Sequence, residues 1–327
     1  MWRYAEWLPV IDDANRVSLE EGWTPLLILH KLAMKLGLKK LLLKDESTNP
    51  TGSFKARGLS VAVSKAKELG ITHCVIPTAG NAGAALSAYT AKANIKATVI
   101  MPRHTPGTLK EICRLHGADL ILTDGLIDAC GKKAKQLSEK TGAFDMSTMK
   151  EPYRLEGKKT LGYEIAEQLN WQLPDVIIYP TGGGTGLIGM WKAFKEMQQI
   201  GWLQGRLPKM IIVQSKTCNP MIQMFETGIF PETFSPEASK AYGLAVPSPF
   251  AKDLIQQVVK ESKGTAVTVS EDEMLKGIET FATTEGILLS PEGSATYMGL
   301  KKLIEKDYIR EDETVLLFNT GSWLTYR

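Results

Sequence analysis

The feature that most constrains the fold is an alternation of short apolar runs with segments of helical periodicity, which starts near residue 40. An apolar run, a helical segment and a second apolar run form the pattern of a βαβ unit, in which neighbouring strands are parallel. The fold class is therefore α/β, with open parallel sheets covered by helices. We predict strands at 41–44, 73–77, 97–101, 119–123, 175–179, 210–214, 265–269 and 314–318, which fit two sheets.

The helical segments lie between these strands and are bounded by capping residues. Gly70 and Gly117 lie where a left-handed residue would end a helix, and Ser270, which precedes two acidic residues, predicts an N-cap. Residues 218–254 are rich in Pro, Ser and Gly and have no clear period, so we expect a loop-bearing insertion or mobile cover there. We predict helices at 59–69, 82–92, 108–115, 126–141, 158–169, 187–199, 271–284 and 294–305.

Charge and hydropathy exclude several classes of partner. The 39 basic and 36 acidic residues are mixed along the chain, so nucleic acid is not indicated as a partner. The most basic run, from Lys31 to Lys44, is interpreted as the solvated face of a helix and a strand. Because no segment approaches the roughly 20 apolar residues that a membrane span requires, we expect no membrane partner and a cytoplasmic protein.

The cysteines and histidines do not indicate a metal site or a disulfide framework. The four cysteines are widely spaced and form no Cys-x-x-Cys pair, and Cys74 lies in an apolar run where core packing is expected. The four histidines are equally scattered, which favours surface or packing roles. We therefore expect no metal. The residues concerned are Cys74, Cys113, Cys130, Cys218, His30, His73, His104 and His116.

A single lysine, Lys55, stands where a strand passes through a Pro/Gly turn into a helix. An ammonium near a helix N-terminus meets the positive end of the helix dipole, and partial burial behind Phe54 would also favour the neutral amine. Both effects lower the pKa of the Lys55 amine. A neutral amine can form a Schiff base, so Lys55 is a candidate for covalent chemistry. The alternative interpretation is that Lys55 is a surface lysine in the first turn of the helix.

A glycine-rich loop follows the strand predicted at 175–179 and precedes a helix. Four glycines in five positions let backbone N–H groups converge on an anion, and the helix dipole adds to the attraction, which predicts a phosphate site at Gly182, Gly183, Gly184, Thr185 and Gly186. The spacing is neither that of a Walker loop nor that of a dinucleotide-binding loop. The alternative to a phosphate site is a tight turn whose glycines serve packing alone. The number of glycines in this loop makes that alternative less favoured.

Two further strand ends carry polar or small residues. The loop containing Thr78, Ala79, Gly80, Asn81 and Ala82 allows a close backbone approach and could bind a carboxylate through its N–H groups, although Gly-Asn is also common turn chemistry. The last predicted strand ends in Asn-Thr-Gly, where the hydroxyl of Thr320 lies at the edge at which open α/β sheets place ligands. An ordinary strand-terminating turn is the alternative.

Together these segments resemble the fold-type-II family of pyridoxal-phosphate enzymes, and within it the threonine synthases. The resemblance covers nearly the whole chain and follows the order of the family's motifs. The segments that carry it are residues 20–26 (EEGWTPL), 49–55 (NPTGSFK), the Gly80-Asn81 loop, residues 152–160 (PYRLEGKKT), the glycine-rich loop and Thr320-Gly321.

The resemblance implies two open parallel-sheet αβα lobes with the cofactor in the cleft between them. We place the large cofactor-binding domain at 1–57 plus 149–327 and the small mobile domain at 58–148. By resemblance, Lys55 forms the Schiff base with pyridoxal 5′-phosphate and moves protons, the glycine-rich loop holds the phosphate, Asn81 bonds the ring hydroxyl and Thr320 faces the pyridine nitrogen. Because a hydroxyl stabilises a protonated pyridine less than a carboxylate does, elimination chemistry is expected.

Substrate contacts are carried over in the same way, to Thr78, Ala79, Gly80 and Ala82 of the small-residue loop and to Arg154. This chain departs from the family pattern at several of the neighbouring positions. Ala56 follows the lysine where family members commonly have Asp, and Thr148, Met149 and Glu151 replace residues that help to hold a substrate phosphate. A glutamate at that place would repel a phosphorylated substrate, whereas Arg154, Lys158 and Lys159 are retained.

Three functions remain open from the sequence. The first is a threonine synthase-like lyase that converts O-phosphohomoserine to threonine and phosphate by γ-elimination and β-addition of water. The second is a threonine or serine dehydratase, or a β-replacement enzyme, favoured by Ala56 and Glu151. The third is a non-catalytic phosphate-ligand binding protein, which retention of Lys55 argues against. A small amino acid as substrate and a homodimer, the usual state of the family, are expected.

Overall fold

The computed structural model describes residues 1–232 and 239–326 and divides the chain into two compact units. Unit 1 comprises Met1–Trp23, Thr48–Leu161 and Leu324–Arg327, and unit 2 comprises Thr24–Ser47 and Gly162–Trp323. These bounds place residues 1–23, 48–57, 149–161 and 324–327, which were predicted for the large domain, with the segment predicted as the small domain. The mobility predicted for residues 58–148 stays a prediction.

Unit 1 is built on a four-stranded parallel sheet in the order β5-β4-β3-β6. The strands are β3 (His73–Pro77), β4 (Lys96–Pro102), β5 (Asp119–Thr123) and β6 (Phe144–Asp145). One face of the sheet packs against α2 (Lys55–Glu68), α3 (Asn81–Ala93) and α4 (Gly107–Leu115), and the other face packs against α5 (Ile127–Thr141). Side chains alternate accordingly, since Cys74 and Ile76 face the first layer and Val75 the second. Short 3₁₀ helices, η1 (Trp2–Trp7) and η2 (Asp13–Asn15), precede this core.

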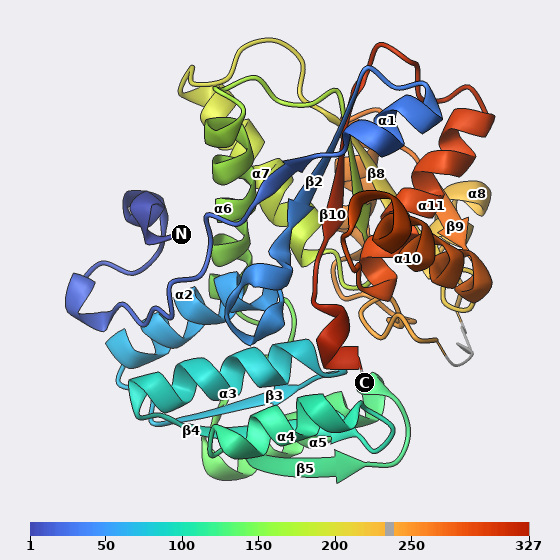
Figure 1. The fold of residues 1–327 in the computed structure, drawn as a ribbon. Coiled ribbons are helices and arrows are strands. Elements are labelled where there is room, and N and C mark those ends of the chain that lie inside the picture. Colours follow the sequence, from blue (N-terminus) through green and yellow to red (C-terminus); the bar gives the residue numbers. More distant parts are fainter. Residues whose placement is uncertain (233–238, 327) are drawn as a thin grey trace. The chain divides into compact units, whose positions relative to one another are not determined.

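Unit 2 is built on a six-stranded sheet in the order β1-β2-β10-β7-β8-β9. Figure 1 labels β2, β10, β8 and β9 of this sheet. The strands are β1 (Leu26–Ile28), β2 (Lys40–Asp45), β7 (Val176–Pro180), β8 (Lys209–Ser215), β9 (Ala266–Val269) and β10 (Thr314–Asn319). β1 pairs antiparallel with β2, and the other described pairings are parallel. The central strands are fully buried and consist almost entirely of apolar residues, as expected for parallel strands with both faces covered.

Helices cover this sheet on both faces. One face packs against α1 (His30–Leu36), α10 (Glu271–Glu285) and α11 (Pro291–Glu305), of which α10 and α11 lie side by side in Figure 1. The other described helices of unit 2 include α7 (Thr185–Gln199), α8 (Pro220–Thr227) and α9 (Lys252–Glu261). Of these, α9 packs against both α7 and β8. A longer helix, α6 (Tyr153–Gln168), runs through the boundary between the units at Leu161.

The predicted strands are confirmed to within one residue at each end, and the predicted helices end within one residue of the observed ends. Gly70 and Gly117 adopt the left-handed conformation expected after α2 and α4, with φ of 70° and 79°. Ser270 caps α10 in a full capping box with Glu273. Strands β1 and β6 were not predicted, being only three and two residues long.

The predicted loop-bearing insertion at 218–254 contains α8 and the start of α9, and the described residues between them form no helix or strand; residues 233–238 lie outside the described chain. One sequence interpretation was wrong. The run from Lys31 to Lys44 is not solvated throughout. Lys44 is fully buried, and its ammonium forms an ion pair of 3.1 Å with Glu164 and donates to the carbonyl oxygen of Thr24 at 2.8 Å.

The described helices include none with the length and apolar character needed to cross a bilayer.

Candidate active site

Lys55 is the first residue of α2, at the end of the turn that the sequence predicts. The turn contains the 3₁₀ helix η4 (Pro50–Gly52), in which Thr51 has a φ of 62°, and the chain then extends through Ser53 before the helix starts. The Lys55 side chain is half-buried, and its ammonium nitrogen lies 4.0 Å from the centre of the Phe54 ring. The prediction of partial burial behind Phe54 is confirmed.

A second lysine, Lys158 of α6, lies against the same ring. Its ammonium nitrogen is 4.7 Å from the ring centre of Phe54 and donates to the Phe54 carbonyl oxygen at 3.0 Å. The side chain reaches this place because α2 and α6 touch at two glycines. A Cβ on Gly58 would lie 2.6 Å from the Lys158 nitrogen, and one on Gly157 would lie 2.3 Å from the carbonyl oxygen of Arg57. Sequence reasoning missed this contact, although the two glycines were a signal.

The small-residue loop links β3 to α3 in unit 1. Gly80 has a φ of 143°, a conformation that favours glycine, and its N–H donates to the Thr78 hydroxyl at 3.0 Å. Thr78 and Ala82 are buried, and Ala79 is half-buried. The carboxylate site predicted at this loop stays a prediction.

Asn81 begins α3 and carries the amide that the resemblance singles out. Its Nδ2 lies 3.2 Å from the hydroxyl of Tyr326, and its buried Oδ1 has no hydrogen-bond partner within residues 1–232 and 239–326. Because a hydroxyl can donate as well as accept, exchanging the amide nitrogen and oxygen keeps the bond to Tyr326 and puts an N–H at the buried, unpaired position. The side chain can therefore serve a ligand as donor or acceptor.

Arg154 and Glu151 form a buried pair at the start of α6. The guanidinium donates to the carbonyl oxygen of Met146 at 2.7 Å, and its Nε lies 4.0 Å from a carboxylate oxygen of Glu151. The second carboxylate oxygen accepts from the Arg154 backbone N–H at 2.9 Å. Burial raises the pKa of Glu151, with the Arg154 charge opposing the rise, and burial also lowers the pKa of Arg154.

The glycine-rich loop lies between β7 and α7 in unit 2. Gly184 precedes α7 with a φ of 75°, and no side chain in the described chain caps this helix end. The N–H groups of its first turn are therefore left for a ligand or water. A Cβ on Gly184 would lie 2.5 Å from Ile255, and one on Gly186 would lie 1.9 Å from the Tyr179 hydroxyl, so both positions require glycine. Thr185 is buried between them.

Thr320 follows β10 and is buried at 7% exposure. The residue before it, Asn319, is fully buried and connects three segments. Its Oδ1 accepts from the backbone N–H of Ser290 at 3.0 Å, and its Nδ2 donates to Asp45 at 2.9 Å. The end of β10 is thereby tied to the end of β2 and to the N-cap of α11. Sequence reasoning did not identify Asn319 as part of the site.

The structure brings the predicted residues together in two groups, one in each unit. Unit 1 contains Lys55, Thr78, Ala79, Gly80, Asn81, Ala82 and Arg154, and unit 2 contains Gly182, Gly183, Gly184, Thr185, Gly186 and Thr320. In both groups the residues lie at the carboxyl ends of parallel strands or at helix starts, where α/β sheets place ligands.

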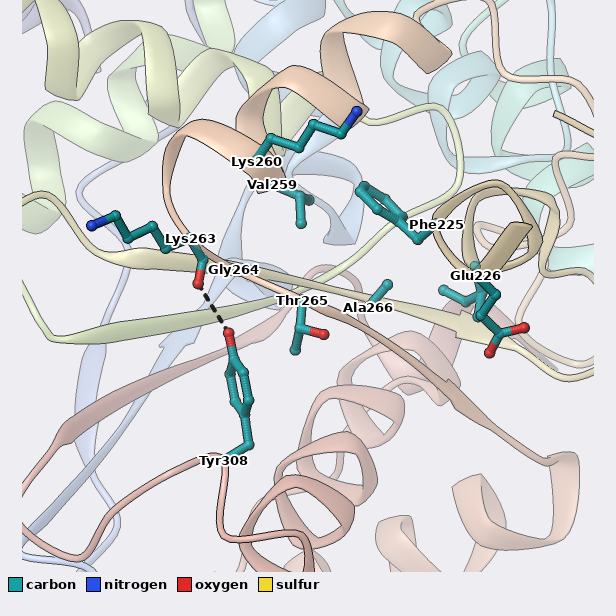
Figure 2. Close-up of a pocket in the computed structure, with 10 residues that line it drawn as sticks. Phe225, Glu226, Val259, Lys260, Lys263, Gly264, Thr265, Ala266 and Tyr308 are labelled. Carbon is teal, nitrogen blue, oxygen red and sulfur yellow. Dashed lines mark hydrogen bonds between the residues drawn. The ribbon is translucent and has the colours of Figure 1, made fainter. Parts of the chain in front are cut away.

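A separate cavity of about 540 Å³ lies beside β9 in unit 2 and contains none of the predicted residues. Figure 2 shows Tyr308 at its border, where the hydroxyl donates to the Lys263 carbonyl oxygen at 3.0 Å. The charged residues around it are exposed lysines and a glutamate on the surface. The lining residues are Ile222, Phe225, Glu226, Val259, Lys260, Lys263, Gly264, Thr265, Ala266 and Tyr308.

The cysteines occupy the core. All four are free and buried, which confirms the packing role expected for Cys74. Within the described part of the chain, no group of three or more His, Cys, Asp or Glu side chains is arranged to hold a metal ion.

Comparison with known proteins gives consistent matches over nearly the whole chain. The sequence pattern of the family described as "Pyridoxal-phosphate dependent enzyme" matches residues 17–321. A threonine synthase of Methanocaldococcus jannaschii is 36% identical, and one of Methanosarcina acetivorans is 37% identical; each alignment covers 99% of this chain and 80% of the relative. The solved structure of maize serine racemase has a TM-score of 0.79 at 21% identity, covering 95% of this chain and 93% of that chain, and shows the shared fold.

Proposed function

This chain belongs to the family of pyridoxal-phosphate-dependent enzymes, and from that membership we propose that it is a lyase of the threonine synthase type. Its substrate would be O-phosphohomoserine, which loses phosphate from the γ-carbon and gains water at the β-carbon to give threonine. The observation that carries this proposal is the similarity of 36–37% over 99% of the chain to proteins named threonine synthase.

The residues of both units fit the cofactor. The glycine-rich loop offers N–H groups at a helix start, and a side chain at Gly184 or Gly186 would collide with its neighbours. In unit 1 the hydroxyl of Ser53 and the Oδ1 of Asn81 are buried polar atoms without a hydrogen-bond partner among the described residues. Buried polar atoms of this kind are costly unless a ligand or water pairs with them, which supports a polar ligand at this place.

We assign roles to this chain's own residues as follows. When bound, pyridoxal phosphate supplies an electron sink for the carbon next to the substrate amine. Lys55 would hold the cofactor through its amine and then accept and return the proton of the substrate α-carbon. Gly182, Gly183, Gly184, Thr185 and Gly186 would bind the phosphate, Asn81 the ring hydroxyl and Thr320 the ring nitrogen. The backbone of Thr78, Ala79, Gly80 and Ala82 would bind the substrate carboxylate.

A second candidate function is favoured by the buried pair of Arg154 and Glu151. The guanidinium already bonds the Met146 carbonyl oxygen and lies beside the carboxylate, so its charge is offset before any substrate binds. A neutral hydroxyl on the substrate side chain would meet less repulsion there than a phosphate group. This observation supports a threonine or serine dehydratase, or a β-replacement enzyme.

A substrate screen on the purified holoenzyme tests both candidates. The proposal predicts equal amounts of phosphate and threonine from O-phosphohomoserine, and little ammonia from serine or threonine. Ammonia and a keto acid from serine or threonine, without phosphate release from O-phosphohomoserine, would favour the second candidate instead. A Glu151→Gln variant adds a direct comparison, because removing this carboxylate should improve the use of the phosphorylated substrate relative to serine.

The assembly and location of the enzyme also remain proposals. We propose a homodimer in the cytoplasm, as is usual for the family that the chain resembles. Sedimentation equilibrium would give twice the chain mass of 36.0 kDa for the dimer, and a value near the chain mass itself would contradict it.

A further inference from the structure

The glycine-rich loop of unit 2 is covered by a segment from the region that follows α8. This cover segment, residues 239–246, touches the loop at its first glycine. A Cβ on Gly182 would lie 2.2 Å from the carbonyl oxygen of Gly243 and 2.9 Å from a methyl group of Val246. The two backbones are therefore in direct contact, and the position of Gly243 limits where Gly182 can lie.

A glutamate from α11 fixes Gly243 from the opposite side. The Oε1 atom of Glu292 accepts the backbone N–H of Gly243 at 2.7 Å, and the Glu292 side chain is 3% exposed. A Cβ on Gly243 would lie 2.9 Å from the same oxygen. Glu292, Gly243 and Gly182 are thus linked by two consecutive contacts that end at the glycine-rich loop.

Glu292 is held rigidly by the start of its helix. Ser290 caps α11 by accepting the Gly293 N–H at 3.1 Å, and Pro291 occupies the first helical position. The N–H of Ser290 in turn donates to Asn319, the residue before Thr320. The helix start that carries Glu292 is therefore hydrogen-bonded to the end of β10.

The start of the cover segment has a separate anchor. Glu271, the first residue of α10, accepts the Ser239 hydroxyl at 2.7 Å and the Lys240 N–H at 2.9 Å. This anchor holds the segment to α10 and does not involve Gly243. The bond from Glu292 acts directly on Gly243, the residue whose backbone touches the glycine-rich loop.

We propose that Glu292 is a positioning residue for the phosphate site: by holding Gly243 against Gly182, it fixes the glycine-rich loop in the shape that binds the cofactor phosphate. This inference rests on the proposed placement of the phosphate at that loop. Its physical basis is that N–H groups bind an anion well only when their directions are set before the anion arrives.

The hydrogen bond accepted by Glu292, rather than its charge, carries the effect. Glu292→Gln keeps an oxygen that can accept the Gly243 N–H, whereas Glu292→Ala removes it. Losing a buried hydrogen bond to a charged group weakens a binding equilibrium that depends on this bond by about tenfold or more. We therefore expect Glu292→Ala to weaken pyridoxal 5′-phosphate binding by about tenfold, and Glu292→Gln to stay within about threefold of the unmodified protein.

The test compares binding of pyridoxal 5′-phosphate with binding of pyridoxal, which lacks the phosphate. Both affinities are measured by absorbance titration of protein stripped of cofactor, and the ³¹P chemical shift is recorded for the reconstituted holoenzyme. Glu273→Ala is the matched control, because Glu273 also serves a helix start and, among residues 1–232 and 239–326, its carboxylate bonds Ser270 and Lys302 rather than the cover segment. Gly243→Ala is a second variant, since its added methyl group pushes against Glu292 while the residue itself is exposed.

The proposal expects Glu292→Ala and Gly243→Ala to lose affinity for the phosphorylated vitamer alone and to shift the ³¹P signal, with Glu273→Ala unchanged. Equal losses for both vitamers, or an unchanged ³¹P signal, would overturn it, because a general loss of structure does not select the phosphate. Should Glu292→Ala fail to fold, Gly243→Ala decides by the same criteria. An unmodified protein that does not prefer the phosphorylated vitamer would instead refute the placement of the phosphate.

Discussion

Replacing Asn319 by alanine should destabilise unit 2 by an amount that the hydrogen bonds define. The side chain is fully buried, accepts the Ser290 N–H and donates to Asp45. Asn319→Ala leaves that buried N–H without its acceptor, at about 1–3 kcal/mol, and removes a donor from Asp45. We expect a total loss of about 3 kcal/mol. For a unit of this size, 1 kcal/mol corresponds to roughly 2–4 °C in Tm, so Tm should fall by about 6–12 °C.

The assay is thermal unfolding of the holoenzyme at a fixed excess of cofactor, followed by near-UV circular dichroism. Thr280→Ala is the control, because its exposed hydroxyl bonds only within α10, and we expect less than about 2 °C of change. Asn319→Asp places a second carboxylate beside Asp45, so its loss of stability should grow as the pH rises from 5 to 8. A Tm for Asn319→Ala within about 2 °C of the unmodified protein would refute the role given to this network.

Two further predictions concern buried polar groups. Burial raises the pKa of Cys74 to about 12 and those of Cys113 and Cys218 to about 11, so these thiols should resist a disulfide reagent at pH 8 until urea is added; rapid labelling of the native protein would contradict this. Each thiol has a higher pKa in the folded protein than in the unfolded chain. The folded state therefore keeps its full stability below the ordinary thiol pKa and loses stability as the pH rises toward 11–12. Glu21→Ala should destabilise unit 1 by about 2–4 kcal/mol, because it leaves two buried hydroxyls, those of Tyr89 and Ser60, without the carboxylate that accepts them at 2.6 and 2.7 Å. A urea midpoint unchanged from the unmodified protein would argue against this.

Much of the fold follows from local sequence signals. A parallel strand buried on both faces is a continuous apolar run, and β3 was therefore predicted to the residue. The edge strand β5 is only half-buried, but its apolar centre placed it to the residue as well. Helix starts were harder to place. α2 and α6 each begin four or more residues before the predicted start, in stretches that contain Gly58 and Gly157. Glycine weakens a helix signal, but here the fold uses both glycines for close contact between the two helices.

The site divides in the same way. Lys55 and the glycine-rich loop were visible because their chemistry depends on residues that are adjacent in the sequence. Glu292, Asn319 and Lys158 were not, since their partners lie far along the chain. Glu292 acts on a residue 49 positions away, and Lys158 on one 104 positions away. A single sequence contains no signal for such pairs until the fold brings them together.

The central claim is that the amine of Lys55 carries the cofactor. Reducing the holoenzyme with borohydride fixes pyridoxal phosphate to the lysine that holds it, and peptide mass mapping then identifies that residue. We predict the added mass on the peptide containing Lys55, together with loss of the visible absorbance band in Lys55→Ala. A reduced adduct on Lys158 or another lysine, or a Lys55→Ala variant that keeps the band, would contradict the assignment.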